Sequence, residues 1–210
     1  MITHIVWDWN GTLFDDFDVC VKSINTLLTR HGLPMLSDGE YRQVFGFPVR
    51  QYYKSIGFDF DKTPFEVLAE EYMSIYQPLS DSCGLRAGAQ DTVDRLNRAG
   101  YVSVVLSASR LDHLERQISK TGLHGIARLY GTDDIHASGK EHLARRLAAD
   151  YPHAGFLFVG DTPHDALAAK HINADAVFLA GGHKAAEELE KYGPVLKDIC
   201  ALPQWLNRKK

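Results

Sequence analysis

Residues able to act on a phosphate group follow the carboxyl ends of several strand-like segments. Asp8 ends the first segment, Ser107 ends the second, and Asp161 and Asp165 follow a later one, while Lys140 opens a helix-like segment between them. Ligands of open α/β sheets bind beyond the carboxyl ends of the strands. These side chains are therefore expected to converge at one edge of a sheet.

Such a group of side chains suits phosphoryl transfer. Strand-end carboxylates can hold Mg²⁺, a hard cation that prefers oxygen ligands, and one of them can attack phosphorus to form an aspartyl-phosphate. Lys140 and Ser107 can bind the phosphoryl oxygens, and the Gly11-Thr12 turn offers backbone N–H groups to the same oxygens. Taken singly, each residue also fits a structural role, such as a capped turn at Asp8 or a solvated lysine at Lys140. Their joint occurrence in this order favours the functional interpretation.

Short apolar segments rich in Val, Leu and Phe predict the strands that would position these residues. They occupy residues 4–8, 101–107, 156–160 and 176–180, with a weaker candidate at 126–130. Amphipathic segments predict the helices between them, at 88–99, 111–121, 139–150, 165–171 and 184–192. This alternation is typical of buried parallel strands in an α/β protein. We therefore expect a Rossmann-like three-layer core around a central parallel sheet.

Residues 15–83 break that alternation. Apolar residues recur there at helical spacing, as in Val21, Ile24 and Leu28, and no segment resembles a strand. The stretch is too long for a simple crossover between two strands. We expect a small helical domain inserted at 15–83, with a catalytic core formed by residues 1–14 and 84–210. The predicted hinges are Asp15-Asp16 and residues 80–84.

The composition is that of an ordinary globular chain, with 45% hydrophobic and 24% charged residues among 210. The net charge of −4 gives no global attraction for nucleic acid or an anionic membrane. No apolar run approaches the ~20 residues of a transmembrane helix, and the N-terminus lacks a signal-peptide pattern. Cys20, Cys83 and Cys200 lie far apart, which suits reduced thiols. We expect a cytoplasmic monomer or homodimer with neither nucleic acid nor membrane as partner.

The ordered motifs resemble those of the haloacid dehalogenase superfamily, in particular its phosphatases with a helical cap. The run Asp8-Trp9-Asn10-Gly11-Thr12-Leu13 is similar to the first motif, Ser107 to the second, Lys140 to the third, and Gly160-Asp161 with Asp165 to the fourth. Residues 15–83 stand where the superfamily places its cap, and residues 46–53 resemble the cap of phosphoglycolate phosphatases. Residues 174–179 and Gly181-Gly182 also fit that group.

The resemblance implies a role for each matching residue. Asp8 would be the nucleophile and a Mg²⁺ ligand, with Asn10 ligating through its backbone carbonyl and Asp161 through its carboxylate. Asp165 would hold a metal-bound water or position Lys140. The phosphoryl group would bind Ser107, Lys140 and the backbone of Trp9 and Ala108. The implied reaction is Mg²⁺-dependent hydrolysis of a small phosphorylated metabolite, with 2-phosphoglycolate as the first candidate.

Asn10 departs from the superfamily pattern, which usually has a second Asp there. That Asp protonates the leaving group and later activates water, and an amide cannot exchange a proton in this way, so a contribution of typically ~10²–10⁴-fold is missing or supplied elsewhere. His113, His164 and Asp15 are candidate substitutes. A second hypothesis is an impaired protein with a binding or regulatory role.

A third hypothesis concerns phosphonoacetaldehyde hydrolases, which the Asp8-Trp9-Asn10-Gly11-Thr12 context also resembles. Those enzymes form a Schiff base on a cap lysine, and this chain has Arg50 near that position, with Lys54 close by in surroundings that do not match.

Substrate specificity is expected to come from the cap. Arg50, Arg42 and residues 46–48 are candidates for binding the leaving group, while Arg110 and His113 would line the mouth of the site.

Overall fold

A six-stranded parallel sheet forms the centre of the computed structural model, which describes residues 1–133 and 139–209. The strands are β1 (His4–Trp7), β2 (Val102–Arg110), β3 (Ile126–Thr132), β4 (Phe156–Gly160), β5 (Asp175–Leu179) and β6 (Val195–Leu196). Their order is β3-β2-β1-β4-β5-β6, and every neighbouring pair is parallel. β1 therefore lies between β2 and β4, so three strand ends that carry polar residues are adjacent.

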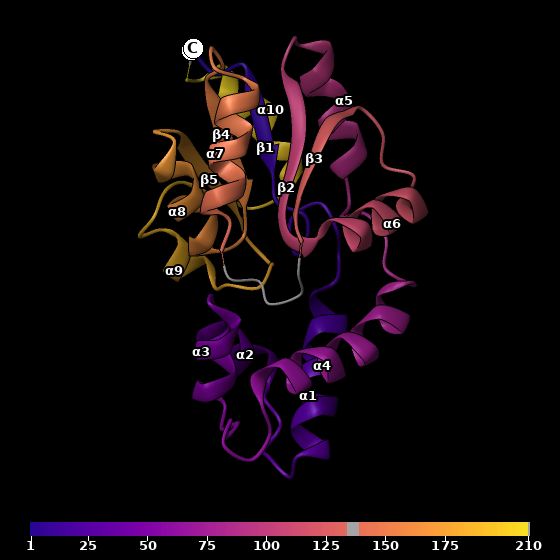
Figure 1. Ribbon diagram of the computed structural model, residues 1–210. Coiled ribbons are helices and arrows are strands. Elements are labelled where there is room, and N and C mark those ends of the chain that lie inside the picture. Colours follow the sequence, from indigo (N-terminus) through magenta and orange to yellow (C-terminus); the bar gives the residue numbers. More distant parts are fainter. Residues whose placement is uncertain (134–138, 210) are drawn as a thin grey trace.

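Helices cover both faces of the sheet, because successive strand residues point to opposite sides. Ile5 and Trp7 pack with α5 (Ala89–Arg98), α6 (Leu111–Thr121) and α10 (Leu202–Asn207). Val6 packs on the other face with α7 (Glu141–Asp150) and α8 (Pro163–His171). Figure 1 shows these helices flanking the strands. The predicted three-layer Rossmann-like α/β core is confirmed.

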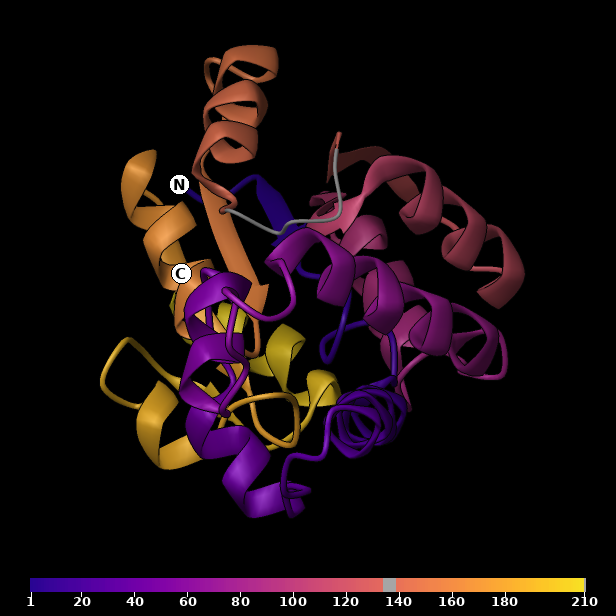
Figure 2. The same ribbon diagram turned by 60° about the horizontal axis from the view of Figure 1, so that its bottom comes forward.

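Four helices lie beyond the carboxyl ends of the strands: α1 (Phe17–Arg30), α2 (Asp38–Val44), α3 (Val49–Ser55) and α4 (Phe65–Ser80). They share a separate apolar core that includes Ile24, Leu68 and Tyr53. Figure 1 shows this group at one end of the molecule, and in Figure 2, where that end comes forward, α1 is seen nearly along its axis. We call it the cap. The boundaries at 14/15 and 83/84 stay a prediction.

The carboxyl-terminal part of the chain differs most from the expected pattern. β6 has two residues, and the expected helix at 184–192 is shortened to α9 (Ala186–Leu189). A 3₁₀ turn, Ile199–Ala201, and α10 follow, neither of which we predicted. Leu202 and Leu206 of α10 are buried against α5, so tertiary packing stabilises a helix too short to form alone.

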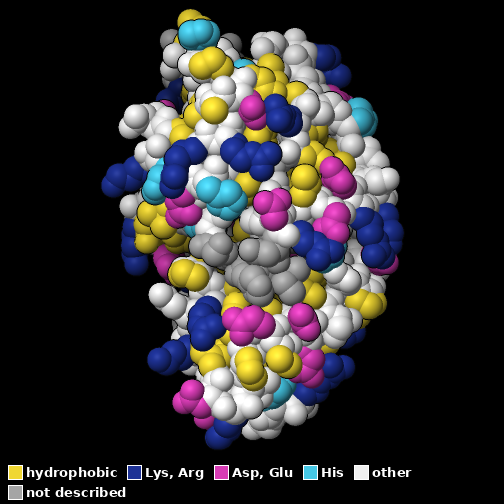
Figure 3. Space-filling model, viewed as in Figure 1, with side chains coloured by type: hydrophobic (Ala, Val, Ile, Leu, Met, Phe, Trp, Pro, Cys, Tyr) yellow, Lys and Arg dark blue, Asp and Glu magenta, His cyan; other side chains and the backbone are white. Residues whose placement is uncertain are grey.

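No helix among the described residues combines the length and apolarity needed to cross a bilayer. On the face seen in Figure 3, basic and acidic side chains are interspersed rather than separated by sign.

Candidate active site

Three carboxylates and one lysine meet at the carboxyl edge of the sheet. Oxygens of Asp8, Asp161 and Asp165 all lie within 4.8 Å of one another, and all three side chains are buried. Lys140 Nζ donates to Asp8 Oδ1 at 2.6 Å and to Asp165 Oδ1 at 2.7 Å. The structure thus brings together four of the residues that the sequence singled out.

The ends of β1, β4 and two helices hold these side chains. Asp8 directly follows β1, and its Oδ1 accepts a hydrogen bond from Trp9 N at 2.6 Å. Asp161 follows β4. Asp165 lies in the first turn of α8, where its side chain and that of Thr162 form a capping box. Lys140 is the N-cap residue of α7.

Two glycines allow the backbone to pass close to the Asp161 carboxylate. Gly11 has a φ of +68°, in the left-handed region, and a Cβ there would overlap the side chains of Asp161 and His183. A Cβ at Gly182 would overlap Asp161 as well. His183 N donates to Asp161 Oδ2 at 2.6 Å, and Thr12 Oγ1 donates to Oδ1 at 3.2 Å. Glycine at these positions lets two loops converge on this carboxylate.

The site carries more negative than positive charge. Burial and the neighbouring Asp165 raise the pKa of Asp8 to about 8, against the opposing effect of Lys140. Burial also raises the pKa of Asp161. Burial would lower the pKa of Lys140, but Asp165 and Asp8 outweigh it, so its pKa is raised and the lysine stays charged. One ammonium group, paired with two of them, therefore lies beside three carboxylates.

This donor set fits a magnesium ion. Mg²⁺ prefers hard oxygen ligands and is commonly held by one or two carboxylates with retained waters. The oxygens of Asp8, Asp161 and Asp165 are close enough to share one ion, and a divalent cation would offset their mutual repulsion.

The second strand end adds hydroxyl groups to the site. Ser107 is buried at the end part of β2 and lines the same cavity as Asp8 and Lys140. Its Oγ accepts from Ser109 N at 3.1 Å. Ala108 lines the cavity too, whereas the Trp9 side chain is fully buried and donates through Nε1 to Gln117 at 2.8 Å.

The Asn10 side chain is held on both sides. Its Nδ2 donates to Asp16 Oδ2 at 2.6 Å and to the Tyr76 hydroxyl at 2.9 Å. Its Oδ1 accepts from Ser109 Oγ at 2.8 Å. The amide thus connects the strand ends of the core with α4 of the cap.

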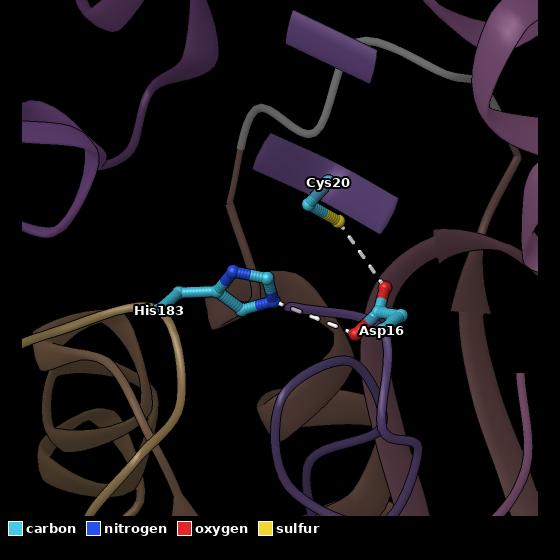
Figure 4. Close-up of side chains that lie close together, drawn as sticks. All are labelled: Asp16, Cys20 and His183. Atoms are coloured by element: carbon cyan, nitrogen blue, oxygen red, sulfur yellow. Dashed lines mark hydrogen bonds and ion pairs between the residues drawn. The ribbon is translucent and has the colours of Figure 1, made fainter. Parts of the chain in front are cut away.

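Asp16, at the predicted hinge, is the centre of this network. Its Oδ1 accepts from Gly11 N at 2.9 Å and faces His183 Nε2 at 3.6 Å, while its Oδ2 accepts from Tyr76 at 2.7 Å. Figure 4 shows Cys20 and His183 directed at the two oxygens of Asp16. Burial would raise the pKa of Asp16, but hydrogen bonding and the charge of His183 outweigh it and lower the pKa. Both oxygens are already satisfied, so we interpret Asp16, Cys20 and His183 as a hydrogen-bonded anchor rather than a metal site.

The three candidate substitutes for an acid at position 10 occupy different places. His164 Nε2 accepts from Lys140 N at 3.0 Å, and burial lowers the pKa of this imidazole to about 4. His113 lines the cavity, and Gln77 Nε2 lies 2.8 Å from its Nε2. Asp15 is exposed and is absent from the described cavity lining. None of the three lies within hydrogen-bond distance of Asp8 among the described contacts.

The candidate specificity residues occupy different places relative to the cavity. Arg50 is exposed, pairs with Glu66 at 3.4 Å, and does not line the cavity, and the same exposure and absence from the lining hold for Lys54. Arg42 donates to the Gly182 carbonyl at 3.1 Å and so connects the cap to the core. Of residues 46–48, only Phe47 lines the cavity. Arg110 lines the cavity and pairs with Asp112.

A sequence model of haloacid dehalogenase-like hydrolases matches residues 5–179, most of the chain. The chain belongs to this family. Residues 5–179 include all the strand ends described above, so the family match covers the clustered carboxylates and Lys140.

Relatives within the haloacid dehalogenase-like hydrolases span nearly the whole chain. A phosphoglycolate phosphatase of Xanthomonas campestris is 26% identical over 216 residues, covering 95% of this chain and 97% of the relative. One from Synechococcus elongatus is 21% identical over 206 residues, covering 96% and 91%. The pyrophosphatase PpaX of Bacillus velezensis is 23% identical over 210 residues, covering 92% and 90%.

A solved structure of a haloacid dehalogenase-like family hydrolase from Streptococcus pneumoniae matches with a TM-score of 0.85 at 17% identity, covering 98% of both chains. This likeness supports the fold of the haloacid dehalogenase-like core and cap.

Several residues that complete this haloacid dehalogenase-like site were missed from the sequence. The sequence predicts Asp16 only as a hinge residue and gives no site role to His183, Tyr76 or Arg86. Arg86 donates to the carbonyls of Gly11 and Ala180 at 2.9 and 2.6 Å and so holds two site loops together. The Gly181-Gly182 pair was a local signal for the loop that carries His183, whereas nothing near Arg86 marks it.

Proposed function

We propose that the chain hydrolyses phosphate monoesters of small molecules in a Mg²⁺-dependent reaction that passes through an aspartyl-phosphate on Asp8. The observation that carries this proposal is the position of Asp8. Its carboxylate lines the cavity beneath the cap, within 2.6 Å of a charged lysine and beside two further carboxylates.

In the first step, a carboxylate oxygen of Asp8 forms a bond to phosphorus while the bond between phosphorus and the ester oxygen breaks. The departing oxygen takes up a proton from water. In the second step, water attacks the same phosphorus and gives a proton to solvent, which releases inorganic phosphate and the free Asp8 carboxylate.

The other residues bind and orient the phosphoryl group. Lys140 Nζ, the Ser107 hydroxyl and the N–H groups of Trp9 and Ala108 would bind its oxygens. Asp8, Asp161 and Asp165, with the backbone carbonyl of Asn10, would hold Mg²⁺. When bound, this ion neutralises charge that develops on the phosphoryl oxygens.

The cap would close over the substrate and limit access of water. The hydroxyl of Tyr41, in α2, lies 3.0 Å from His183 Nδ1, and Lys184 Nζ donates to the Gln43 carbonyl at 3.1 Å. Both contacts join the cap to the loop that follows β5, and His183 N of this loop donates to the Asp161 carboxylate. Closure of the cap and the position of this carboxylate would therefore be coupled.

The names of the relatives give two candidate substrates, 2-phosphoglycolate and pyrophosphate. Arg50, proposed from the sequence as a substrate ligand, would have to leave Glu66 to take that role. The cytoplasmic location and the monomeric or homodimeric state stay predictions.

Asn10 favours a second candidate function, an impaired protein that binds ligands with little turnover. The buried contacts between Lys140, Asp8 and Asp165 oppose it, because a charged cluster out of water is costly to keep without a use.

The test compares wild type with Asp8→Asn on a panel of phosphate esters, with Mg²⁺ or with a chelator. We expect phosphate release that requires both Asp8 and Mg²⁺, and a covalent enzyme-bound phosphate that hydroxylamine removes. Asp61→Asn, a change of the same kind at an exposed site, serves as the matched control. An active Asp8→Asn variant would exclude the covalent mechanism, and absence of turnover on the whole panel would favour the impaired protein.

A further inference from the structure

We infer, on the basis of the proposed function, that the substrates are phosphate monoesters of phenolic alcohols, with the aromatic ring bound beneath the cap. Three observations support this inference: the side chains that line the cavity, the pairing of its charged groups, and the contacts of Asn10.

The cap side of the cavity is apolar and aromatic. Its volume of about 180 Å³ exceeds that of the engineered apolar cavity of about 150 Å³ that binds benzene. Asp8, Ser107 and Lys140 line the same cavity, so a phosphoryl group would occupy one part of this volume. The remaining part suits a group no larger than roughly one ring. The aromatic side chains contributed by the cap are Tyr41, Phe45, Phe47, Tyr52, Tyr53, Tyr72 and Tyr76. Aromatic side chains favour ring ligands through edge-to-face and stacked contacts.

The described lining offers no unpaired cation to a carboxylate or a second phosphate on the substrate. Arg110 pairs with Asp112, and Arg116 pairs with Asp81 at 2.7 Å, and both arginine side chains are exposed to solvent. Lys140 is held by two carboxylates of the site itself. A leaving group with its own negative charge would therefore lose hydration without gaining a counter-charge.

No described side chain around Asn10 is placed to protonate the leaving group, and His113, which lines the cavity, has its Nε2 2.8 Å from Gln77 Nε2 and a pKa lowered by burial. The Asn10 amide cannot do so, and Asp16, whose oxygens accept from Gly11, Asn10 and Tyr76, is fully buried and outside the cavity lining. Each ring nitrogen of His183 faces a partner, Tyr41 on one side and Asp16 on the other.

A phenol compensates for the missing acid through its own chemistry. Its pKa of about 10 lies well below the value of about 15.7 for water, which represents hydroxyl groups that are not attached directly to an aromatic ring. A phenolate can therefore leave from phosphorus as the anion and take up its proton afterwards from water.

The hydroxyl of Tyr52 gives a further detail of this recognition. Tyr52 is 5% exposed and lines the cavity, and its hydroxyl has no hydrogen-bond partner among the described residues. Because a buried hydroxyl without a partner is costly, we assign it to a polar substituent on the ring of the ligand.

The test measures kcat/KM for phenyl, benzyl and cyclohexyl phosphate and for 2-phosphoglycolate. Phenyl and cyclohexyl phosphate are similar in size, and benzyl phosphate keeps the ring but leaves as an alkoxide. We expect phenyl phosphate to exceed each of the others by at least about 10²-fold, the low end of what a general acid supplies. The double variant Asn10→Asp/Asp16→Asn, which places a carboxyl at position 10, should reduce the ratio of phenyl to benzyl phosphate at least tenfold.

A second measurement tests Tyr52. The best of the three hydroxyphenyl phosphates should exceed phenyl phosphate by about fivefold, the effect of one ordinary hydrogen bond, and Tyr52→Phe should remove this difference. Tyr192→Phe, at an exposed tyrosine, is the control and should preserve it. Equal rates with phenyl and benzyl phosphate, or a preference for 2-phosphoglycolate, would overturn the inference and leave the proposed function intact. No Asp8-dependent hydrolysis of any ester would overturn both.

Discussion

The Asn10 side-chain amide donates to the Asp16 carboxylate across 2.6 Å, at the predicted hinge between core and cap. A carboxylate at position 10 would face a second carboxylate at that distance, whereas an amide supplies the donor that Asp16 requires. The side chain of Asn10 is therefore matched to that of Asp16, so asparagine at this position has a structural role as well as lacking an acid.

Asn10→Asp alone should destabilise the fold at neutral and alkaline pH. Two carboxylates at hydrogen-bond distance, one fully buried at position 16 and one partly buried at position 10, repel, so the pKa of one is raised. Above that pKa both are charged, and we expect the free energy of unfolding to fall by about 3–5 kcal/mol, the cost of an uncompensated buried charge. The folded variant retains a proton that the unfolded chain releases near pH 4, so the loss grows as the pH rises. Urea unfolding at pH 5 and pH 8 measures it.

The control is the double variant Asn10→Asp/Asp16→Asn, which exchanges amide and carboxylate. It should recover at least half of the lost stability at pH 8, because the pair again has one donor and one acceptor. Equal stability of the single variant at both pH values would show that the two side chains are not coupled.

Lys140→Met should reduce kcat by about 10²–10³-fold, the usual effect of removing one group that stabilises charge in the transition state. Methionine fills similar space, but Asp8 and Asp165 lose the ammonium that lies 2.6 and 2.7 Å from their oxygens. Steady-state kinetics at saturating Mg²⁺ measures this effect. Lys54→Met, at an exposed lysine, is the matched control, and more than a tenth of wild-type kcat in Lys140→Met would contradict the assigned role.

The clustered site could be predicted because its residues directly follow strands with strong local signals. Asp8 and Asp161 come after runs of buried apolar residues, and the carboxyl ends of parallel strands meet at one edge. The Asp16 network could not be predicted in the same way. Its partners Tyr76 and His183 lie 60 and more residues away in sequence, and no local pattern marks which tyrosine or histidine turns inward.

The same reasoning explains the missed elements and the position of Arg50. β6 has two residues, too few to show an alternating pattern, and α10 is stabilised by burial of Leu202 and Leu206 rather than by its own length. Arg50 looked available for a substrate because its ion-pair partner, Glu66, lies on another helix.

Gly11→Ala should weaken Mg²⁺ binding more than backbone strain alone explains. A left-handed φ costs an L-residue about 1–2 kcal/mol, and the new methyl group would also overlap the Asp161 carboxylate. Gly32→Ala provides the matched control, since Gly32 has a φ of +67° and nothing within 4 Å of the added Cβ. Thermal unfolding is measured for each variant with and without Mg²⁺. Adding Mg²⁺ should raise the Tm of Gly32→Ala and should raise the Tm of Gly11→Ala much less. Equal rises would place the ion away from Asp161.

His164→Gln should remove part of the acid sensitivity of the fold. Burial lowers the pKa of His164 to about 4, while an unfolded histidine titrates near 6.5. Between these values the unfolded chain binds one more proton, so stability falls as the pH drops from about 6.5 to about 4, by up to about 3 kcal/mol. Glutamine carries no titrating proton and can still accept from Lys140 N, as His164 Nε2 does at 3.0 Å.

The unfolding free energy, measured between pH 4 and pH 8, should therefore depend less steeply on pH in His164→Gln than in wild type. The control is His171→Gln, at an exposed histidine of the same helix, which should retain the wild-type slope. An unchanged slope in His164→Gln would mean that another group controls the response to acid.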